Sequence, residues 1–291
     1  MMASPLFSII IPTYARPVEL VDCLEALARL QLGRDAFEVI IVDDGSPSPP
    51  AAVVERFRDR LDVGLITAPH GGPAAARNRG AERATGKFLA FTDDDCRPAS
   101  NWLDALAART VAAPDHIVGG LTMNALPRNA YAATSQLIVD VAYAYYNDHG
   151  AEARFFASNN MALPADGFRA IGGFDPSFTT SEDRELCDRW LRRGYRMSYA
   201  PEAVVYHAHS LTLRRFWWQH FGYGRGAWRF HRIREQRGAG QFRPDLTFYK
   251  QLGVAPFANA RDPRLPIIAA LVVISQLANC AGFLYERTHA G

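Results

Sequence analysis

Short apolar runs alternate with amphipathic segments along the first 120 residues. The apolar runs are rich in β-branched residues and lie at 7–11, 38–42, 63–67 and 87–92. Segments with apolar residues at helical spacing follow them, at 17–30, 51–61, 73–84 and 101–112. Near-continuous apolar strands that alternate with helices predict an α/β fold, in which a parallel sheet carries helices on both faces.

Polar clusters follow three of the four predicted strands. They are Pro12-Thr13-Tyr14, the stretch 43–46 (Asp-Asp-Gly-Ser) and the stretch 93–95 (Asp-Asp-Asp). In sheets of this kind, ligands bind at the carboxyl ends of the strands. The three clusters are therefore the first candidates for a functional site.

Composition excludes several classes of protein. Apolar residues make up 48% of the 291 residues and charged residues 21%, which is ordinary for a globular chain and unlike a disordered or fibrous one. The net charge of +2 gives no reason to expect a nucleic-acid partner. The four cysteines are scattered without a C-x-x-C pair, which argues against a cysteine zinc site and a disulfide framework.

Asp93, Asp94 and Asp95 follow a buried strand, and strand alternation would aim the first and third the same way. Carboxylates gathered in one cleft repel one another unless a cation is present, and hard oxygen ligands suit Mg²⁺ or Mn²⁺. The alternative is an acidic loop or helix cap. A second carboxylate pair at Asp43-Asp44 favours a binding site, where it would accept hydrogen bonds from a nucleobase or ribose.

A glycine pair, Gly71-Gly72, precedes a predicted helix that starts at Pro73. The start of a helix attracts anions, and Arg77 and Asn78 follow as candidate contacts to a nucleotide. The alternative is a plain loop and helix.

Together these motifs resemble the family 2 glycosyltransferases. The resemblance rests on Pro12-Thr13-Tyr14, Asp43-Asp44-Gly45-Ser46, the Pro-x-x-Ala-Arg-Asn-x-Gly stretch at 73–80 and the triple aspartate, in this order and spacing. It implies an inverting enzyme with the glycosyltransferase A fold, a nucleotide-diphosphate sugar as donor and Mn²⁺ or Mg²⁺ as metal. The donor contacts that it implies are Pro12, Thr13, Tyr14, Asp44, Arg77, Asp93, Asp94 and Asn160.

The second half of the chain extends the resemblance to about residue 210. Residues 158–162, with Asn160, are similar to the segment that lines the donor site, and residues 171–175 are similar to a loop near the acceptor. Glu182-Asp183 opens a helix predicted to run to about Arg193. By itself the pair is an acidic helix start favoured by the helix dipole. The resemblance assigns Asp183 as the catalytic base, with Glu182 in support.

Two histidines follow a predicted strand at 203–206, and alternation places His207 and His209 on one face. Histidines near strand ends are often structural. The resemblance points to His207 as a partner of Asp95 and Asp93 at the metal, with His209 as the weaker candidate.

The last eighty residues have a different character. Residues 211–243 combine aromatic residues with eight arginines, and Gly222, Gly224 and Gly226 argue against one continuous amphipathic helix there. Between Arg264 and Glu286 lie 21 residues without a formal charge, which is long enough for a span. This stretch is a transmembrane helix, a helix in the interface or a buried helix. Next to the arginines and aromatics, we expect contact with the inner membrane surface through 211–287.

The predicted organisation is a catalytic domain at 1–210 and a helical extension at 211–291. Within the first, residues 1–120 form the nucleotide-sugar half, with a Rossmann-like, mixed and mainly parallel sheet, and 121–210 the acceptor half. The expected reaction is transfer of a sugar, with a UDP-sugar as donor, to a glycan or lipid-linked acceptor in envelope assembly. The absence of a visible signal sequence predicts a cytoplasmic site at the membrane face.

Two other functions stay open at this point. Among enzymes, the alternative is a nucleotide-sugar hydrolase or a nucleotidyltransferase with a similar sheet. Outside enzymes, it is a catalytically silent carbohydrate-binding subunit, although such a chain has no need to keep both sets of acidic motifs.

Overall fold

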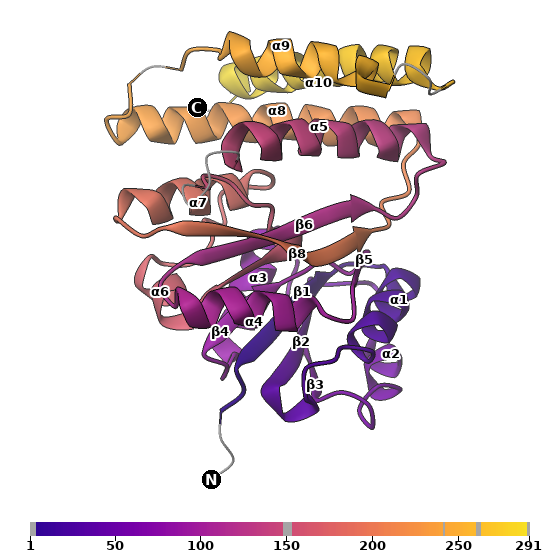
Figure 1. Cartoon of the computed structure of the whole chain (residues 1–291), viewed down its shortest axis with the longest axis vertical. Helices are drawn as coiled ribbons and strands as arrows, with labels where there is room; N and C mark the ends of the chain where they lie inside the picture. Colours follow the sequence, from indigo (N-terminus) through magenta and orange to yellow (C-terminus); the bar gives the residue numbers. More distant parts are fainter. Residues whose placement is uncertain (1–3, 148–152, 241, 260–262, 290–291) are drawn as a thin grey trace.

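The computed structural model describes residues 4–147, 153–240, 242–259 and 263–289 (Figure 1). Its centre is an eight-stranded sheet in the order β3-β2-β1-β4-β7-β6-β8-β5. The first half supplies four parallel neighbours, β1 (Phe7–Thr13), β2 (Phe37–Asp43), β3 (Val63–Thr67) and β4 (Phe88–Phe91). All four strands lie where the apolar runs predict them.

The predicted helices between these strands are also present. They are α1 (Pro17–Leu27), α2 (Ala51–Glu55), α3 (Gly72–Arg83) and α4 (Trp102–Ala112), with a short 3₁₀ turn η1 (Arg34–Ala36) before β2. Helix α2 is shorter than the predicted 51–61, and its chain continues as irregular turns to Leu61. The strand–helix alternation of the sequence therefore predicts the first half of the fold well.

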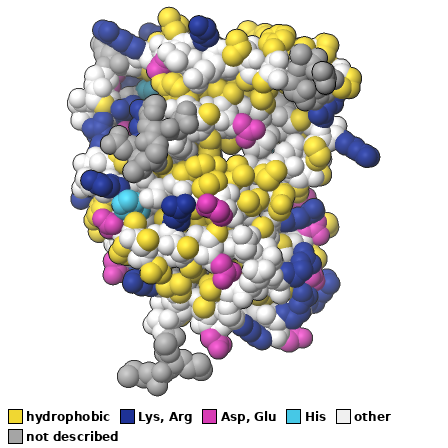
Figure 2. All heavy atoms as spheres, in the orientation of Figure 1, with side chains coloured by type: hydrophobic (Ala, Val, Ile, Leu, Met, Phe, Trp, Pro, Cys, Tyr) yellow, Lys and Arg dark blue, Asp and Glu magenta, His cyan; other side chains and the backbone are white. Residues whose placement is uncertain are grey.

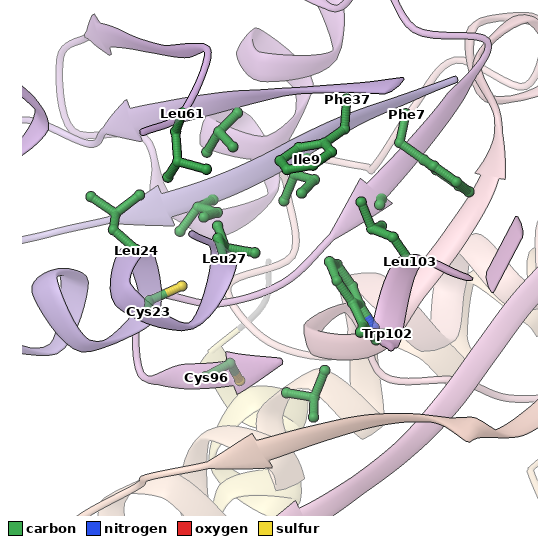
Figure 3. Packing of buried hydrophobic residues seen from close by; sticks show 14 of the residues in the cluster. Phe7, Ile9, Cys23, Leu24, Leu27, Phe37, Leu61, Cys96, Trp102 and Leu103 are labelled. Carbon is green, nitrogen blue, oxygen red and sulfur yellow. The ribbon is translucent and has the colours of Figure 1, made fainter. Parts of the chain in front are cut away.

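Strands β1, β2 and β4 bury both faces, which explains their near-continuous apolar sequence. On one face, Phe7 and Ile9 of β1 pack with Leu24 of α1 and Trp102 of α4 (Figure 3). On the other face, Ile10 packs beneath α3. Two cores therefore hold the sheet between layers of helices.

The second half turns the sheet into a mixed one. Its strands are β5 (Cys96–Pro98), β6 (Ile117–Asn124), β7 (Met161–Pro164) and β8 (Met197–His207). Strand β7 runs antiparallel to both β4 and β6, and β5 antiparallel to β8, whereas β6 and β8 are parallel. The connecting elements are α5 (Ala130–Asn147), η2 (Ser158–Asn160), α6 (Ala165–Ala170) and α7 (Glu182–Arg192). Helix α7 begins and ends within one residue of the prediction.

Helices α8 (Leu213–Gln236), α9 (Leu246–Val254), the 3₁₀ turn η3 (Ala255–Asn259) and α10 (Leu265–His289) follow the last strand. With α5 they form the helical layers at the top of Figure 1. The prediction that glycines interrupt residues 211–243 is wrong, because α8 is one helix of 24 residues. Glycines instead allow α8 and α10 to pack closely against each other. A Cβ at Gly224 would lie 2.0 Å from the carbonyl oxygen of Asn279, and one at Gly282 would lie 1.9 Å from that of Phe221.

Helix α10 is the apolar stretch of the sequence, and it lies along α8. Its inner face buries Leu271, Ser275, Ala278 and Gly282. Near its end, the buried carboxylate of Glu286 pairs with both Arg225 and Arg229 of α8. Helix α10 therefore packs on the domain along one face and leaves its other face exposed, so it is not a fully buried helix. By length and composition α10 is also the one helix among the described residues that could cross a membrane.

Candidate active site

The three aspartates lie in a turn between β4 and β5, where each carboxylate has different partners. Asp94 accepts hydrogen bonds from the Thr13 hydroxyl at 2.7 Å and from Arg16 at 3.1 Å. Asp95 accepts one from Arg16 at 3.0 Å and lies 3.2 Å from Nε2 of His207. Because this segment is a turn, the expected strand alternation does not govern it, and the neighbours Asp94 and Asp95 share one guanidinium.

Burial and these contacts give the neighbouring carboxylates of Asp94 and Asp95 different pKa values. Burial raises the pKa of Asp94 to about 7, although Arg16 and Thr13 oppose the shift. Burial acts in the same direction on Asp95, but the hydrogen bond and charge of His207, together with Arg16, outweigh it and hold the pKa of Asp95 well below its usual range. Asp95 is therefore the ionised member of the pair.

A cation fits beside Asp95. Oxygen, sulfur and nitrogen atoms of Asp95, Cys96 and His207 lie within 4.8 Å of one another. Strand pairing causes this, since Cys96 stands opposite His207 in the β5–β8 register. Burial raises the pKa of the Cys96 thiol well above its usual value, so carboxylate and imidazole are the donors that Mg²⁺ or Mn²⁺ would use there.

The two histidines are neighbours, as alternation predicts. The ring centroids of His207 and His209 are 5.2 Å apart. Burial and the neighbouring His207 lower the pKa of His209 to about 4. Of the two, only His207 has a contact with Asp95. The geometry thus brings Asp95 and His207 together, whereas the Asp93 carboxylate is engaged by Arg77.

Arg77 connects the two halves of the site. Its buried guanidinium donates to Asp93 at 2.6 Å and to Glu182 at 2.8 Å, and it lies over the ring of Phe174. Nε of Arg77 is buried and has no partner among the described residues. The arginine therefore ties the aspartate turn to the start of α7 and balances charge in both places. The sequence suggests a nucleotide contact for Arg77, but all the contacts that the structure gives it are internal.

Asp183 is the second residue of α7 and is partly buried. The chain enters the helix through Ser181 at φ 68°, and Asp183 accepts a hydrogen bond from the Arg184 amide at 2.7 Å. Burial, followed by the charge of Glu182, raises the pKa of Asp183 to about 7, while the Arg184 amide and Arg77 oppose the shift. A carboxylate that titrates near neutral pH suits general-base chemistry.

The loop at Gly71-Gly72 binds a carboxylate of the protein itself. The amides of Gly71 and Gly72 each donate to the Asp44 carboxylate at 2.8 Å, and Nδ1 of His70 lies 2.8 Å from it. The expected attraction of the helix start for an anion is therefore met by an internal side chain. Asp43 differs, because its Oδ2 is buried and has no partner among the described residues. The sequence favours Asp44 as the donor contact, whereas the acceptor atom without a described partner is the buried Oδ2 of Asp43.

The other expected donor residues differ in how exposed they are. Tyr14 is 46% exposed, and its ring lies 4.8 Å from that of His70, at the mouth of the site. Pro12 and Thr13 end β1, where Thr13 fixes Asp94. Asn160 is fully buried and bonds internally, to the carbonyls of Leu121 and Ala203 and to the Trp102 indole.

Arg16 is the functional residue that sequence reasoning missed. It precedes the proline that starts α1, and it holds Asp94 and Asp95 at once. A lone arginine before a helix carries no distinctive signal, so only the folded arrangement identifies it. Asn78 is a candidate nucleotide contact by sequence. In the structure its side-chain amide forms hydrogen bonds with both backbone groups of Phe174 and thereby joins α3 to the loop at 171–175.

Comparison with known proteins agrees with this geometry. The pre-mycofactocin glycosyltransferase of Mycobacterium tuberculosis is 33% identical over 194 residues, covering 65% of this chain and 41% of that protein. The validoxylamine A glucosyltransferase of Streptomyces hygroscopicus subsp. jinggangensis is 30% identical over 229 residues, covering 68% of this chain and 54% of that protein. The chain thus spans about half the length of these relatives.

Solved structures support the fold. A mannosyltransferase from Pyrobaculum calidifontis, in complex with GDP-Man and Mn²⁺, superposes with a TM-score of 0.69 at 19% identity, over 98% of this chain and 88% of that one. The fold is therefore of the glycosyltransferase A type. The family model described as Glycosyl transferase family 2 matches residues 8–171. The chain belongs to the family 2 glycosyltransferases.

Proposed function

We propose that this protein is an inverting glycosyltransferase that moves a sugar from a nucleotide-diphosphate donor to a hydroxyl group. The observation that carries the proposal is the Arg77 bridge. It holds Asp93 of the donor-side turn and Glu182, the neighbour of Asp183, on one guanidinium. The arginine thereby ties a donor-side group to the helix start that carries the proposed base, whose pKa is raised to about 7.

The reaction would be a single displacement. The acceptor oxygen forms a bond to the anomeric carbon, the bond from that carbon to the diphosphate oxygen breaks, and Asp183 takes the acceptor proton. Asp95 and His207, with Asp93 near by, would hold a divalent cation, which would supply positive charge for the leaving diphosphate. Arg16 keeps Asp95 and Asp94 in place throughout.

For the donor, we propose a UDP-sugar. The free Oδ2 of Asp43 would accept a hydrogen bond from the N–H edge of the base, and Tyr14 and His70 would flank it. Asp44 would act indirectly by fixing the loop that carries His70. Asn160 would act from beneath the donor by joining β6, β8 and α4.

A screen of donors separates this function from its alternatives. The protein is incubated with Mn²⁺ and UDP-glucose, UDP-N-acetylglucosamine or GDP-mannose, with and without a panel of p-nitrophenyl glycosides. Nucleoside diphosphate that appears only with a glycoside indicates transfer. Release without a glycoside indicates a hydrolase, and no binding of any donor indicates a silent carbohydrate-binding subunit.

Removing the metal or its ligand is expected to stop the reaction. Excess chelator should abolish turnover, and Asp95→Ala should weaken both Mn²⁺ and donor binding by at least about 10-fold, because lost metal partners cost that much or more. Isothermal titration with Mn²⁺ and then with UDP checks both. Asp22→Ala, which removes an exposed carboxylate of α1, is the matched control. Full activity in chelator would contradict the metal role.

We further propose that the protein works in the cytoplasm against the inner membrane surface, on a glycan or lipid-linked acceptor. The outward face of α10 presents Ile267, Val273, Leu277 and Leu284, each more than half exposed. Figure 2 shows hydrophobic side chains along the top of the molecule, over α9 and α10. An exposed apolar face of this kind marks a site of contact with a membrane or another protein.

A charge on this face is expected to release the protein from lipid. Leu277→Glu should reduce co-sedimentation with vesicles of phosphatidylglycerol and phosphatidylethanolamine, because a carboxylate must leave water to follow the helix into the interface. Val111→Glu, at an equally exposed valine of α4, should leave co-sedimentation unchanged. A wild-type protein that stays with the supernatant at low salt would remove the membrane from the proposal.

A further inference from the structure

The middle of helix α8 packs beside the start of α7, which carries Asp183. The Thr180 hydroxyl donates to the Gly222 carbonyl at 2.8 Å, and a Cβ at Gly226 would lie 2.5 Å from that hydroxyl and 2.6 Å from the Ser181 hydroxyl. Thr180 and Ser181 are the two residues before Glu182-Asp183. The middle of α8 is therefore packed directly against the turn that sets the position of the proposed base.

Two polar side chains project from this part of α8. Nε2 of Gln219 donates to the hydroxyl oxygen of Tyr223 at 2.7 Å, one helical turn away. Oε1 of Gln219 is buried and has no partner among the described residues. Because Gln219 donates to the tyrosine oxygen, the hydroxyl proton of Tyr223 remains available to a further acceptor.

Tyr223 follows Gly222 directly and so belongs to the stretch of α8 that packs on this turn. Its side chain stays 42% exposed, so a ligand has access to it. Burial raises the pKa of Tyr223 to about 12, and the charges of Asp183, Glu182 and Asp93 add to the shift. The Tyr223 side chain is therefore accessible to a ligand, on a helix that lies against the turn before Asp183.

We propose that Tyr223, oriented by Gln219, is a specificity-determining residue that binds the acceptor sugar next to Asp183. This inference rests on the proposed glycosyl transfer and adds the part of the site that holds the acceptor. The Tyr223 hydroxyl donates to an oxygen of the acceptor adjacent to the hydroxyl that reacts. Gln219 acts through Tyr223, because its Nε2 donates to the tyrosine oxygen while its Oε1 is buried. The favoured ligand is therefore a compound with neighbouring hydroxyl groups, such as a pyranose, and a simple alcohol is disfavoured.

The test compares the acceptor with the donor. With the p-nitrophenyl glycoside that the wild-type enzyme uses best, Tyr223→Phe should lower kcat/KM for the acceptor about 10-fold, since one hydrogen bond is lost. The KM for the donor and the melting temperature should not change. Release of nucleoside diphosphate without acceptor should be retained, so the ratio of transfer to hydrolysis falls. Gln219→Leu should shift the same ratio in the same direction.

Tyr195→Phe is the matched control, because that tyrosine stacks on Trp190 beyond the far end of α7. An active wild-type enzyme with an unaffected Tyr223→Phe variant would overturn this inference alone. Equal losses in donor and acceptor parameters, or a lower melting temperature, would make Tyr223 a structural residue and overturn it as well. A wild-type protein that transfers to no glycoside would contradict the proposed function, and the inference would fall with it.

Discussion

Replacing Asp183 by asparagine is expected to lower the turnover of sugar transfer by about 10²-fold or more, which is the contribution of a general base. The amide keeps the size of the carboxylate and still accepts the hydrogen bond from the Arg184 amide. Donor binding should therefore persist. Single-turnover kinetics with a labelled donor, together with a binding titration with UDP, separate the two effects.

The same residue predicts a pH dependence. The pKa of Asp183 is raised to about 7, so the ionised base becomes more abundant as the pH rises, and kcat/KM should increase through pH 7 and then level off. Groups from four helices influence this carboxylate: Glu182 of α7, Arg77 of α3 and, on α5 and α8, Tyr143 and Tyr223. The tyrosines stay neutral in this range, because burial raises the pKa of both.

Asp188→Asn, further along α7, is the matched control and should keep the wild-type pH profile, because Asp188 pairs with Arg192 and Arg234 away from the cleft. Normal turnover in Asp183→Asn, or a wild-type rate that falls between pH 6 and 8, would remove Asp183 from the role of base.

Replacing Arg77 by methionine is expected to cost the most stability of any change at the site. The variant leaves Glu182 buried without its guanidinium and deprives Asp93 of its partner. Breaking a buried ion pair from one side destabilises a protein by roughly 3–5 kcal/mol. Because Asp93 is partly exposed, we expect the lower end of this range, measured as a shift of the urea midpoint.

Two further variants give this prediction its controls. Arg60→Met breaks a solvent-exposed pair with Glu25 and should shift the midpoint far less. In the double variant Arg77→Met with Glu182→Gln, removal of the stranded charge should recover part of the loss. A midpoint equal to that of the wild type in Arg77→Met would show that the bridge does not hold the two halves together.

The strands and helices of the first half were predictable because their sequence signals are local. β-Branched runs and helical spacing place β1 to β4 and three of the intervening helices to within a few residues. The glycines of α8 lead to the wrong prediction of an interrupted helix, because helix propensity also considers only the local sequence. Gly224 and Gly226 cost helix stability, yet their lack of a side chain lets Asn279 and Thr180 approach. A rule based on local sequence cannot identify such distant partners.

The site residues, too, could be predicted from local sequence only in part. Motifs locate Asp95, His207 and Asp183, and the fold brings Asp95 and His207 within 3.2 Å. The partner of each carboxylate depends on contacts between distant segments. Arg77 lies 105 residues before Glu182, and Arg16 lies 78 before Asp94. Motif spacing could not show that Asp44 is satisfied by the glycine loop, or that Asp43 is the carboxylate with a free oxygen.

The close seam between α8 and α10 has a consequence for shortened forms of the protein. A chain that stops before Leu265 would lose the helix that fills the groove at Gly224 and the carboxylate that neutralises Arg225 and Arg229. The same α8 supports the turn before Asp183 on its other side. Deleting the apolar helix would therefore disturb the proposed base as well as the proposed contact with lipid, and only point substitutions on its outer face can separate the two.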